Sequence, residues 1–170
     1  EVRHFEEIFR QGQQPPGGQQ QQRQQQQQNS PAGQQAQQLA QSQKDIINAT
    51  WKLIRREIDA KPTASFASDV EQIAQSQAAL LEKAEALAEK VTDDQSQAHV
   101  EAVVNAMKQA ITHLTAAHEQ VSAALLQPAL VAEQSAYQAL LKLRAREHEV
   151  VRQQQQQSSS SQSQSQARSQ

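Results

Sequence analysis

Few side chains in this sequence have the types and spacing of a metal site. Glu1 and His4 lie three residues apart, as in the Glu-x-x-His pairs of di-iron helical bundles. Such sites need two of these pairs and further glutamates, and no other histidine has a glutamate three residues before it. His113 and His118 lie five residues apart, so on a helix they point in different directions and cannot bind one ion together. We therefore predict no metal site and no cofactor.

Residue patterns for catalysis are also missing from the sequence. It has no cysteine, which excludes disulfides and thiol chemistry. It has no His-Glu-x-x-His zinc motif, no glycine-rich phosphate loop and no serine-centred nucleophile turn. We therefore predict that the protein is not an enzyme and has no catalytic residues.

Two polar residues, Gln77 and His118, stand in heptad rows that are otherwise apolar. A histidine in such a place could titrate near neutral pH, and a polar core could hold a small molecule or an ion. More often, a single polar residue in a heptad row fixes the register of neighbouring helices. We favour this structural role. The alternative is a sensory or ligand-binding bundle with a polar core site near these two residues.

Four helical segments must position these residues: 36–60, 63–91, 94–126 and 128–152. The second and third carry apolar residues in alternating steps of four and three, the pattern of packed helices. The row of the second is Phe66, Val70, Ile73, Gln77, Leu80, Ala84, Leu87 and Val91. The row of the third is Val100, Val104, Met107, Ile111, Leu114, His118, Val121 and Leu125. Because only a few polar residues join them, the two segments form an antiparallel hairpin.

The first and fourth segments are amphipathic as well. Two neighbouring rows run along the first segment, one of Leu39, Ile46 and Leu53 and the other of Ile47, Trp51, Ile54 and Ile58. The fourth segment carries Leu130, Tyr137, Leu141 and Val151 in one row, with Leu140 and Leu143 beside it. Since Trp51 is in step with its row, we interpret it as a core residue.

Small apolar residues widen the buried face of the hairpin. Ala67, Ala74, Leu81 and Ala88 flank the row of the second segment, and Val103, Ala110, Ala117 and Ala124 flank that of the third. A two-stranded coil would carry polar residues there, whereas a bundle helix needs the wider apolar face. The predicted fold class is therefore all-α: an antiparallel helical hairpin extended to a three- or four-helix bundle, with disordered Gln-rich flanks.

Pro128 leaves two architectures open. It either follows a turn and begins a fourth helix, which gives an up-down-up-down bundle, or it kinks one continuous helix. With a kink, the fourth segment projects away from the hairpin, and Tyr137, Leu140 and Leu141 become an apolar patch for a partner chain. We favour the turn, because the heptad row of the third segment falls on polar residues when it is extended past Pro128.

Local signals predict where the helices begin and how their ends meet. Ser68 with Glu71, and Thr92 with Gln95, match the capping box that starts many helices. Antiparallel packing also predicts that the arginines at the end of the first segment lie close to Asp69 and Glu71.

Both flanks are poor in apolar residues, and the chain contains 37 glutamines. Residues 1–11 read as a helical stub, with Val2, Phe5, Ile8 and Phe9 on one face, at the end of a missing upstream element. Residues 12–35 form a linker rich in Gln, Pro and Gly, and residues 153–170 a tail rich in Gln and Ser. Neither can bury enough surface to offset the entropy of ordering, so we predict that both are disordered tethers.

Charge and hydropathy exclude further classes of partner. Residues 34–152 hold 12 basic and 15 acidic residues, which leaves no basic surface for a phosphate backbone. Aromatic residues make up 3% of the chain, too few for a base-stacking surface. No apolar run approaches the roughly 20 residues of a membrane span. We predict no nucleic-acid partner and no transmembrane segment within the chain, although a membrane anchor could lie upstream.

Two stretches, NATWKLIRRE (residues 48–57) and AYQALLKLRAREHEVVR (residues 136–152), stand between glutamine tracts. They resemble the helical region of large bacterial membrane-anchored envelope proteins of unknown function, over about residues 37–152. The resemblance implies membrane-spanning helices upstream of Glu1 and a setting in the bacterial cell envelope. It transfers no site residues.

The predicted function is a non-enzymatic helical spacer and protein-interaction module of a larger, membrane-anchored bacterial protein. Its partners are other proteins or further copies of the chain, bound through helices. The candidate partner-binding residues are Trp51, Tyr137, Leu140 and Leu141, because large apolar side chains dominate such contacts.

Overall fold

The computed structural model describes the backbone of residues 31–59 and 61–168, and the side chains as far as residue 156. The predicted stub at residues 1–11 and residues 12–30 of the predicted linker lie outside this range, whereas residues 31–35 of that linker belong to the first turns of a helix. Within it the chain forms helices and no strand: α3 Pro31–Arg56, α4 Phe66–Lys90, α5 Asp94–Gln120, the 3₁₀ turn η1 Ala123–Leu125, and α6 Leu126–Arg168.

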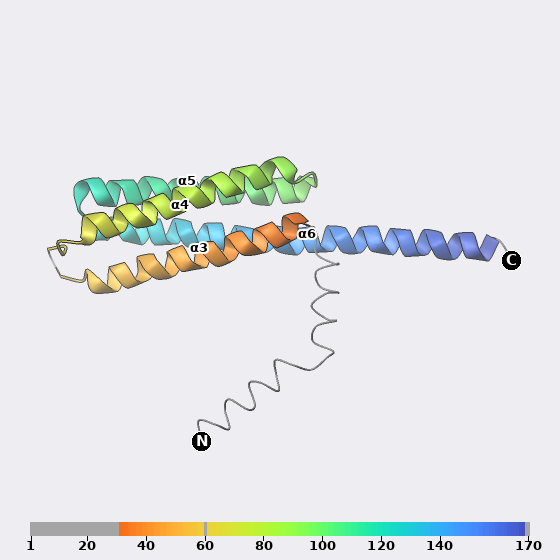
Figure 1. The fold of residues 1–170 in the computed structure, drawn as a ribbon, viewed down its shortest axis with the longest axis horizontal. Helices are drawn as coiled ribbons and strands as arrows, with labels where there is room; N and C mark the ends of the chain where they lie inside the picture. Colours follow the sequence, from red (N-terminus) through yellow and green to blue (C-terminus); the bar gives the residue numbers. More distant parts are fainter. Residues whose placement is uncertain (1–30, 60, 169–170) are drawn as a thin grey trace, which may run out of the picture.

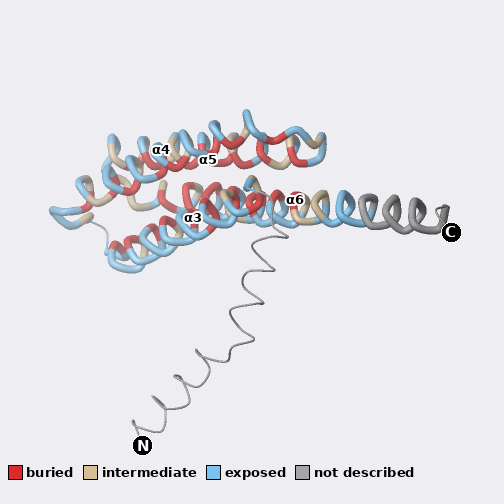
Figure 2. Tube along the Cα trace, turned by 45° about the vertical axis from the view of Figure 1, so that its right-hand side comes forward, coloured by how far each residue is buried: buried red, intermediate tan, exposed pale blue. Residues whose placement is uncertain are grey.

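These helices form an up-down-up-down bundle, as Figure 1 shows. α4 packs on α5, α5 on α6, and α6 returns to pack on α3, while α3 and α4 make the least extensive of the four interfaces. Their buried faces surround one hydrophobic core (Figure 2). The predicted all-α bundle is therefore confirmed, with four helices among the described residues.

The buried face of α4 follows the predicted row without a slip. Every residue of that row is buried: Phe66, Val70, Ile73, Gln77, Leu80, Ala84, Leu87 and Val91. The predicted flanking residues Ala67, Ala74, Leu81 and Ala88 are half-buried beside it. One narrow row of buried residues is enough for α4, because this helix packs extensively on α5 and much less on α3.

On α5 only part of the predicted row is fully buried. Val104, Ile111 and His118 are only half-buried, whereas the neighbouring positions Val103, Ala110 and Ala117 are fully buried. The alanines lie where α5 meets its neighbours, and their small side chains let helix axes approach closely. Val104, Ile111 and His118 lie at the edge of the interface, whereas Val100, Met107 and Leu114 of the predicted row are fully buried.

On α3 the first predicted row, Leu39, Ile46 and Leu53, is buried, whereas in the second row Ile47 and Ile54 are half-buried and the other two residues are exposed. Trp51 is 48% exposed and Ile58 80% exposed. The core positions are taken by polar residues, namely Gln43, Thr50 and Glu57. Gln43 and Thr50 have hydrogen-bond partners inside the bundle, and Glu57, just past the end of α3, has Thr63 in the α3–α4 connection. These bonds offset the usual cost of burying a polar group.

The connection between α5 and α6 is a turn, as favoured, although α5 ends earlier than predicted. Val121 caps α5 in the left-handed conformation, with φ of 48°. Pro128 lies in the first turn of α6, where its missing N–H would have no intrahelical partner. The kinked rod is thereby excluded, because α6 packs along both α5 and α3.

Neither predicted capping box is used. α4 begins at Phe66 after Ser65, whose side chain makes no capping hydrogen bond. α5 is capped by Asp93, one residue after the predicted Thr92, and its carboxylate accepts a hydrogen bond from the Ser96 N–H at 3.0 Å. Aspartate is the stronger choice there, because its charge also suits the helix N-terminus.

The helix α6 continues past the bundle to Arg168, although we predicted that a disordered tail begins at residue 153 (Figure 1). Glutamine is a good helix former, and a helix already nucleated by the bundle gains one hydrogen bond for each residue added. No helix among the described residues is long and apolar enough to cross a membrane.

Candidate protein-interaction site

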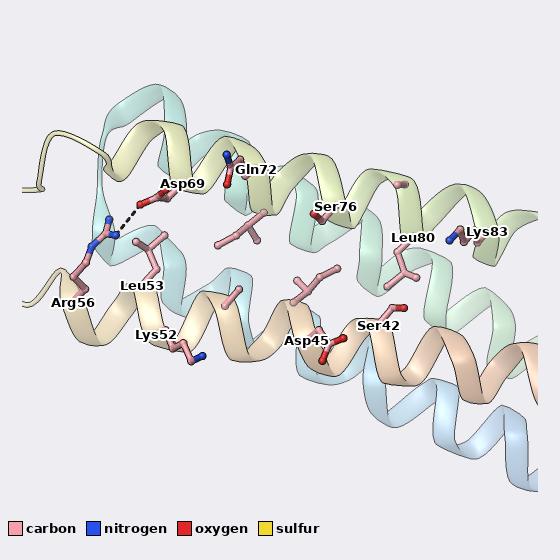
Figure 3. A pocket seen from close by; sticks show the side chains of 14 residues that line it. Ser42, Asp45, Lys52, Leu53, Arg56, Asp69, Gln72, Ser76, Leu80 and Lys83 are labelled. Carbon is pink, nitrogen blue, oxygen red and sulfur yellow. Dashed lines mark ion pairs between the residues drawn. The ribbon is translucent and has the colours of Figure 1, made fainter.

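An open groove of about 750 Å³ runs between α3 and α4, along the least extensive interface of the bundle (Figure 3). Its floor is made of four aliphatic core residues, Ile46 and Leu53 from α3 and Ile73 and Leu80 from α4. From Ser42 to Arg56 the α3 wall covers 15 residues, a length of about 20 Å at 1.5 Å per residue. The groove therefore has the length of a four-turn helix.

The two walls of the groove carry small and charged side chains. They are spaced by three and four residues on both helices: Ser42, Asp45, Ala49, Lys52 and Arg56 on α3, and Asp69, Gln72, Ser76, Ala79 and Lys83 on α4. Ala49 and Ala79 are exposed, and neither fills the space between the walls. Small residues at such positions permit the close approach of another helix.

One end of the groove is closed by an ion pair. Arg56 Nη1 lies 2.8 Å from Asp69 Oδ2, as we predicted for the ends of these two helices (Figure 3). The hydrogen bond that Arg56 donates to Asp69, followed by the one that it donates to Glu57, raises the pKa of Arg56. Glu57 in turn accepts hydrogen bonds from the hydroxyl and the N–H of Thr63, and the hydroxyl contributes most to lowering its pKa. These contacts hold the α3–α4 connection in place.

Beneath the groove, Gln43 and Gln77 join the two helices through their amides. Gln43 Nε2 donates to Gln77 Oε1 at 2.8 Å, and Gln77 Nε2 donates to Gln43 Oε1 at 2.9 Å. Both side chains are fully buried. A reciprocal pair of this kind forms at one relative position of the helices only, so it fixes the register of α3 against α4.

The structure does not bring Gln77 and His118 together. His118 lies on the outer side, where its Nδ1 is 2.9 Å from the carbonyl oxygen of Ala67. It lines a second groove of about 310 Å³ between α4 and α5, and Gln77 lines neither groove. The described residues also contain no group of three or more His, Asp or Glu that could hold a metal ion.

The predicted partner-binding residues occupy different places. Leu140 is fully buried in the core, because α6 packs against the bundle instead of projecting from it. Tyr137 is half-buried against the core, and Leu141 is 37% exposed. Trp51 was interpreted as a core residue and is instead half-exposed. None of the four lines the α3–α4 groove.

Two buried carboxylates on α6 were missed from the sequence. Glu133 accepts a hydrogen bond from the Thr50 hydroxyl at 2.9 Å, and Glu147 accepts one from the Ser96 hydroxyl at 3.0 Å. In the sequence, the one indication of their burial is that both glutamates share the helical spacing of the buried residues of α6. The exposed rows of a helix carry most of its glutamates, so this signal is weak.

The fold and the groove define the class of protein, an all-α four-helix bundle with an open groove between α3 and α4. A scan against models of protein families finds no family that matches the chain. Searches of curated proteins and of solved structures find no significant match in either. The resemblance to bacterial envelope proteins therefore stays a prediction.

Proposed function

We propose that this protein is a non-enzymatic helical spacer and protein-interaction module that binds a helix of a partner protein in the α3–α4 groove. The groove is the observation that carries this proposal. An apolar floor between two walls of small and charged residues is the surface that an amphipathic helix recognises in other helix-in-groove complexes.

The rest of the bundle supports the role of a rigid spacer. Three hydrogen-bonded polar contacts, Gln43 with Gln77, Thr50 with Glu133 and Ser96 with Glu147, join different pairs of helices. They restrict the helices to one register, and α6 extends the molecule to Arg168. A larger membrane-anchored protein of the bacterial envelope is also part of this proposal, and it rests on the sequence resemblance alone.

A peptide selection tests whether the groove is a binding site. A displayed library of amphipathic helical peptides would be selected on the full 170-residue chain. The selected peptides would then be measured against Ala49→Trp/Ala79→Trp, in which indole rings fill the groove from both walls. We expect the double variant to lose at least about tenfold in affinity, since the binding surface is covered.

The matched control is Gln109→Trp, an exposed change on α5 away from both grooves. It should bind the peptides as tightly as the unchanged chain does. Circular dichroism would check that all variants keep the same helix content. Failure to select any peptide, or peptides that bind the groove-filled variant equally well, would contradict the proposed function.

A further inference from the structure

Three charged residues of the α3–α4 groove have no ion-pair partner within the part of the chain that the structure describes. They are Asp45 and Lys52 on the α3 wall and Lys83 on the α4 wall. The other two charged residues of the groove, Arg56 and Asp69, neutralise each other at 2.8 Å. The charge that an occupant would meet is therefore that of two lysines and one aspartate.

The two lysines stand on opposite walls and at different heights. Because α3 and α4 are antiparallel and Arg56 meets Asp69, Lys83 lies at the end of the groove that holds Ser42 (Figure 3). Lys52 is ten residues along α3 from Ser42, which is about 15 Å at 1.5 Å per residue. The positive charges thus lie diagonally across the groove.

From this arrangement we infer that the groove takes an amphipathic helix of about 15 residues that carries one acidic side chain on each flank of its apolar face, at the level of Lys52 and of Lys83, and an uncharged residue facing Asp45. Its large aliphatic residues lie over Ala49, Ser76 and Ala79, where the walls are low. This inference rests on the proposed function and names the chemistry of the partner for the same groove.

A second copy of the chain fits the groove less well. The exposed large apolar residues of the described part are Trp51, Ile58, Val121, Val131 and Leu141, and none of them lines the groove. If two copies met through their α3–α4 faces, each groove would therefore face small and charged side chains. Neither copy would have large apolar side chains there to fill the groove of the other. An acidic-flanked helix supplies both the large apolar side chains and the opposite charge.

Two synthetic peptides test the inference directly. The acidic probe is a 15-residue amphipathic helix with leucines on one face, one glutamate on each flank for Lys52 and Lys83, and glutamine elsewhere on the flanks. The basic probe has lysine at both glutamate positions. Fluorescence anisotropy would measure their binding to the full chain at low salt, where interface charges act most strongly. We expect the acidic probe to bind at least about tenfold more tightly than the basic probe.

Charge reversal on the protein should invert this preference. In Lys52→Glu/Lys83→Glu the basic probe should bind more tightly than the acidic one. The lysines of the basic probe then face glutamates of the groove, whereas the glutamates of the acidic probe face like charge. Lys44→Glu is the matched control, since Lys44 is exposed on α3 and does not line the groove. It should leave the preference unchanged.

The outcomes separate the inference from the proposed function. If both probes bind equally, and Ala49→Trp/Ala79→Trp blocks both, the groove is a helix site but the acidic flanks are wrong. If neither probe binds the unchanged chain, the inference and the proposed groove fail together. Self-association of the chain that Ala49→Trp/Ala79→Trp abolishes would make a second copy the occupant, and it would also overturn the inference.

Discussion

Glu133 is the residue whose environment departs most from that of an ordinary glutamate. Its side chain is fully buried, Oε2 accepts one hydrogen bond from Thr50, and Oε1 has no hydrogen-bond partner among the residues that the structure describes. Burial raises the pKa of this carboxyl to about 8, and the Thr50 bond opposes the rise. At neutral pH the folded protein therefore keeps a proton on Glu133 that the unfolded chain releases, since the ordinary pKa is 4.5.

The pH dependence of stability should report this proton. Because the pKa is raised in the folded state, the contribution of Glu133 is fully present below about pH 4.5 and is lost as the pH rises to about 8. We expect the free energy of unfolding, measured by urea titration, to fall by a few kcal/mol over this range. The variant Glu133→Gln should lack this fall and be the more stable chain at pH 8.

Other carboxylates act in the opposite direction, so the variant is compared with the unchanged chain at every pH. The Arg146 guanidinium holds the pKa of Asp93 well below its usual range, and Glu57 has a lowered pKa as well. Their contributions are present above about pH 4 and are lost in acid. Parallel stability curves for the two proteins between pH 4.5 and 8 would show that the pKa of Glu133 is not raised in the folded protein.

Val121 is held in the left-handed region with φ of 48°, which a β-branched side chain adopts at a cost of about 1–2 kcal/mol. Val121→Gly should therefore stabilise the bundle by about 1 kcal/mol, because 48% of Val121 is exposed and little apolar burial is lost. Thermal unfolding would measure the change. Val131→Gly, at a 60% exposed position inside α6, should instead destabilise by about 0.5 kcal/mol, because glycine is the poorer helix former. A loss of stability in both variants would contradict the strained cap.

At the scale of a helix, α4 and α3 differ in how far their sequences predict their packing. The row of α4 contains seven apolar residues and Gln77, so periodicity alone identified its buried face. The sequence of α3 contains two apolar rows, and periodicity does not tell which of them is buried. In the structure the buried face is the one that also carries the polar residues Gln43 and Thr50. Their hydrogen-bond partners lie 34 and 83 residues away in the chain, so a pattern of neighbouring residues cannot predict these contacts.

The Gln43–Gln77 pair yields a test at this scale. Gln43→Ala alone should destabilise the bundle by about 1–3 kcal/mol, because it leaves the buried Gln77 amide without its partner. Gln43→Leu/Gln77→Leu should be neutral or stabilising, since apolar groups of similar shape replace both polar partners. Urea unfolding of Gln43→Leu, of Gln77→Leu and of the double variant would give the coupling energy. If the single changes simply add, the two amides do not interact.

At the scale of the whole molecule, the sequence predicted the bundle but not the groove. Heptad spacing, short connections and the alanine stripes each require helices packed against one another. The groove depends on how far α3 stands from α4, which follows from packing on α5 and α6 together. The exposed residues Ser42, Ala49, Ser76 and Ala79, at heptad-related spacing, were the available sign that one side is left open. We instead predicted Trp51 and Tyr137 as partner-binding residues because their side chains are large and apolar.

Hydrogen exchange of the full chain, with and without the acidic 15-residue probe, tests the central claim that a helix binds between α3 and α4. We predict slower amide exchange in residues 42–56 and 69–83, the two walls of the groove, because binding stabilises these helices against local opening. Exchange in the middle of α5, which lines no part of this groove, should not change. Unchanged exchange in α3 and α4 under saturating probe, or protection centred on α5 and α6, would contradict the account.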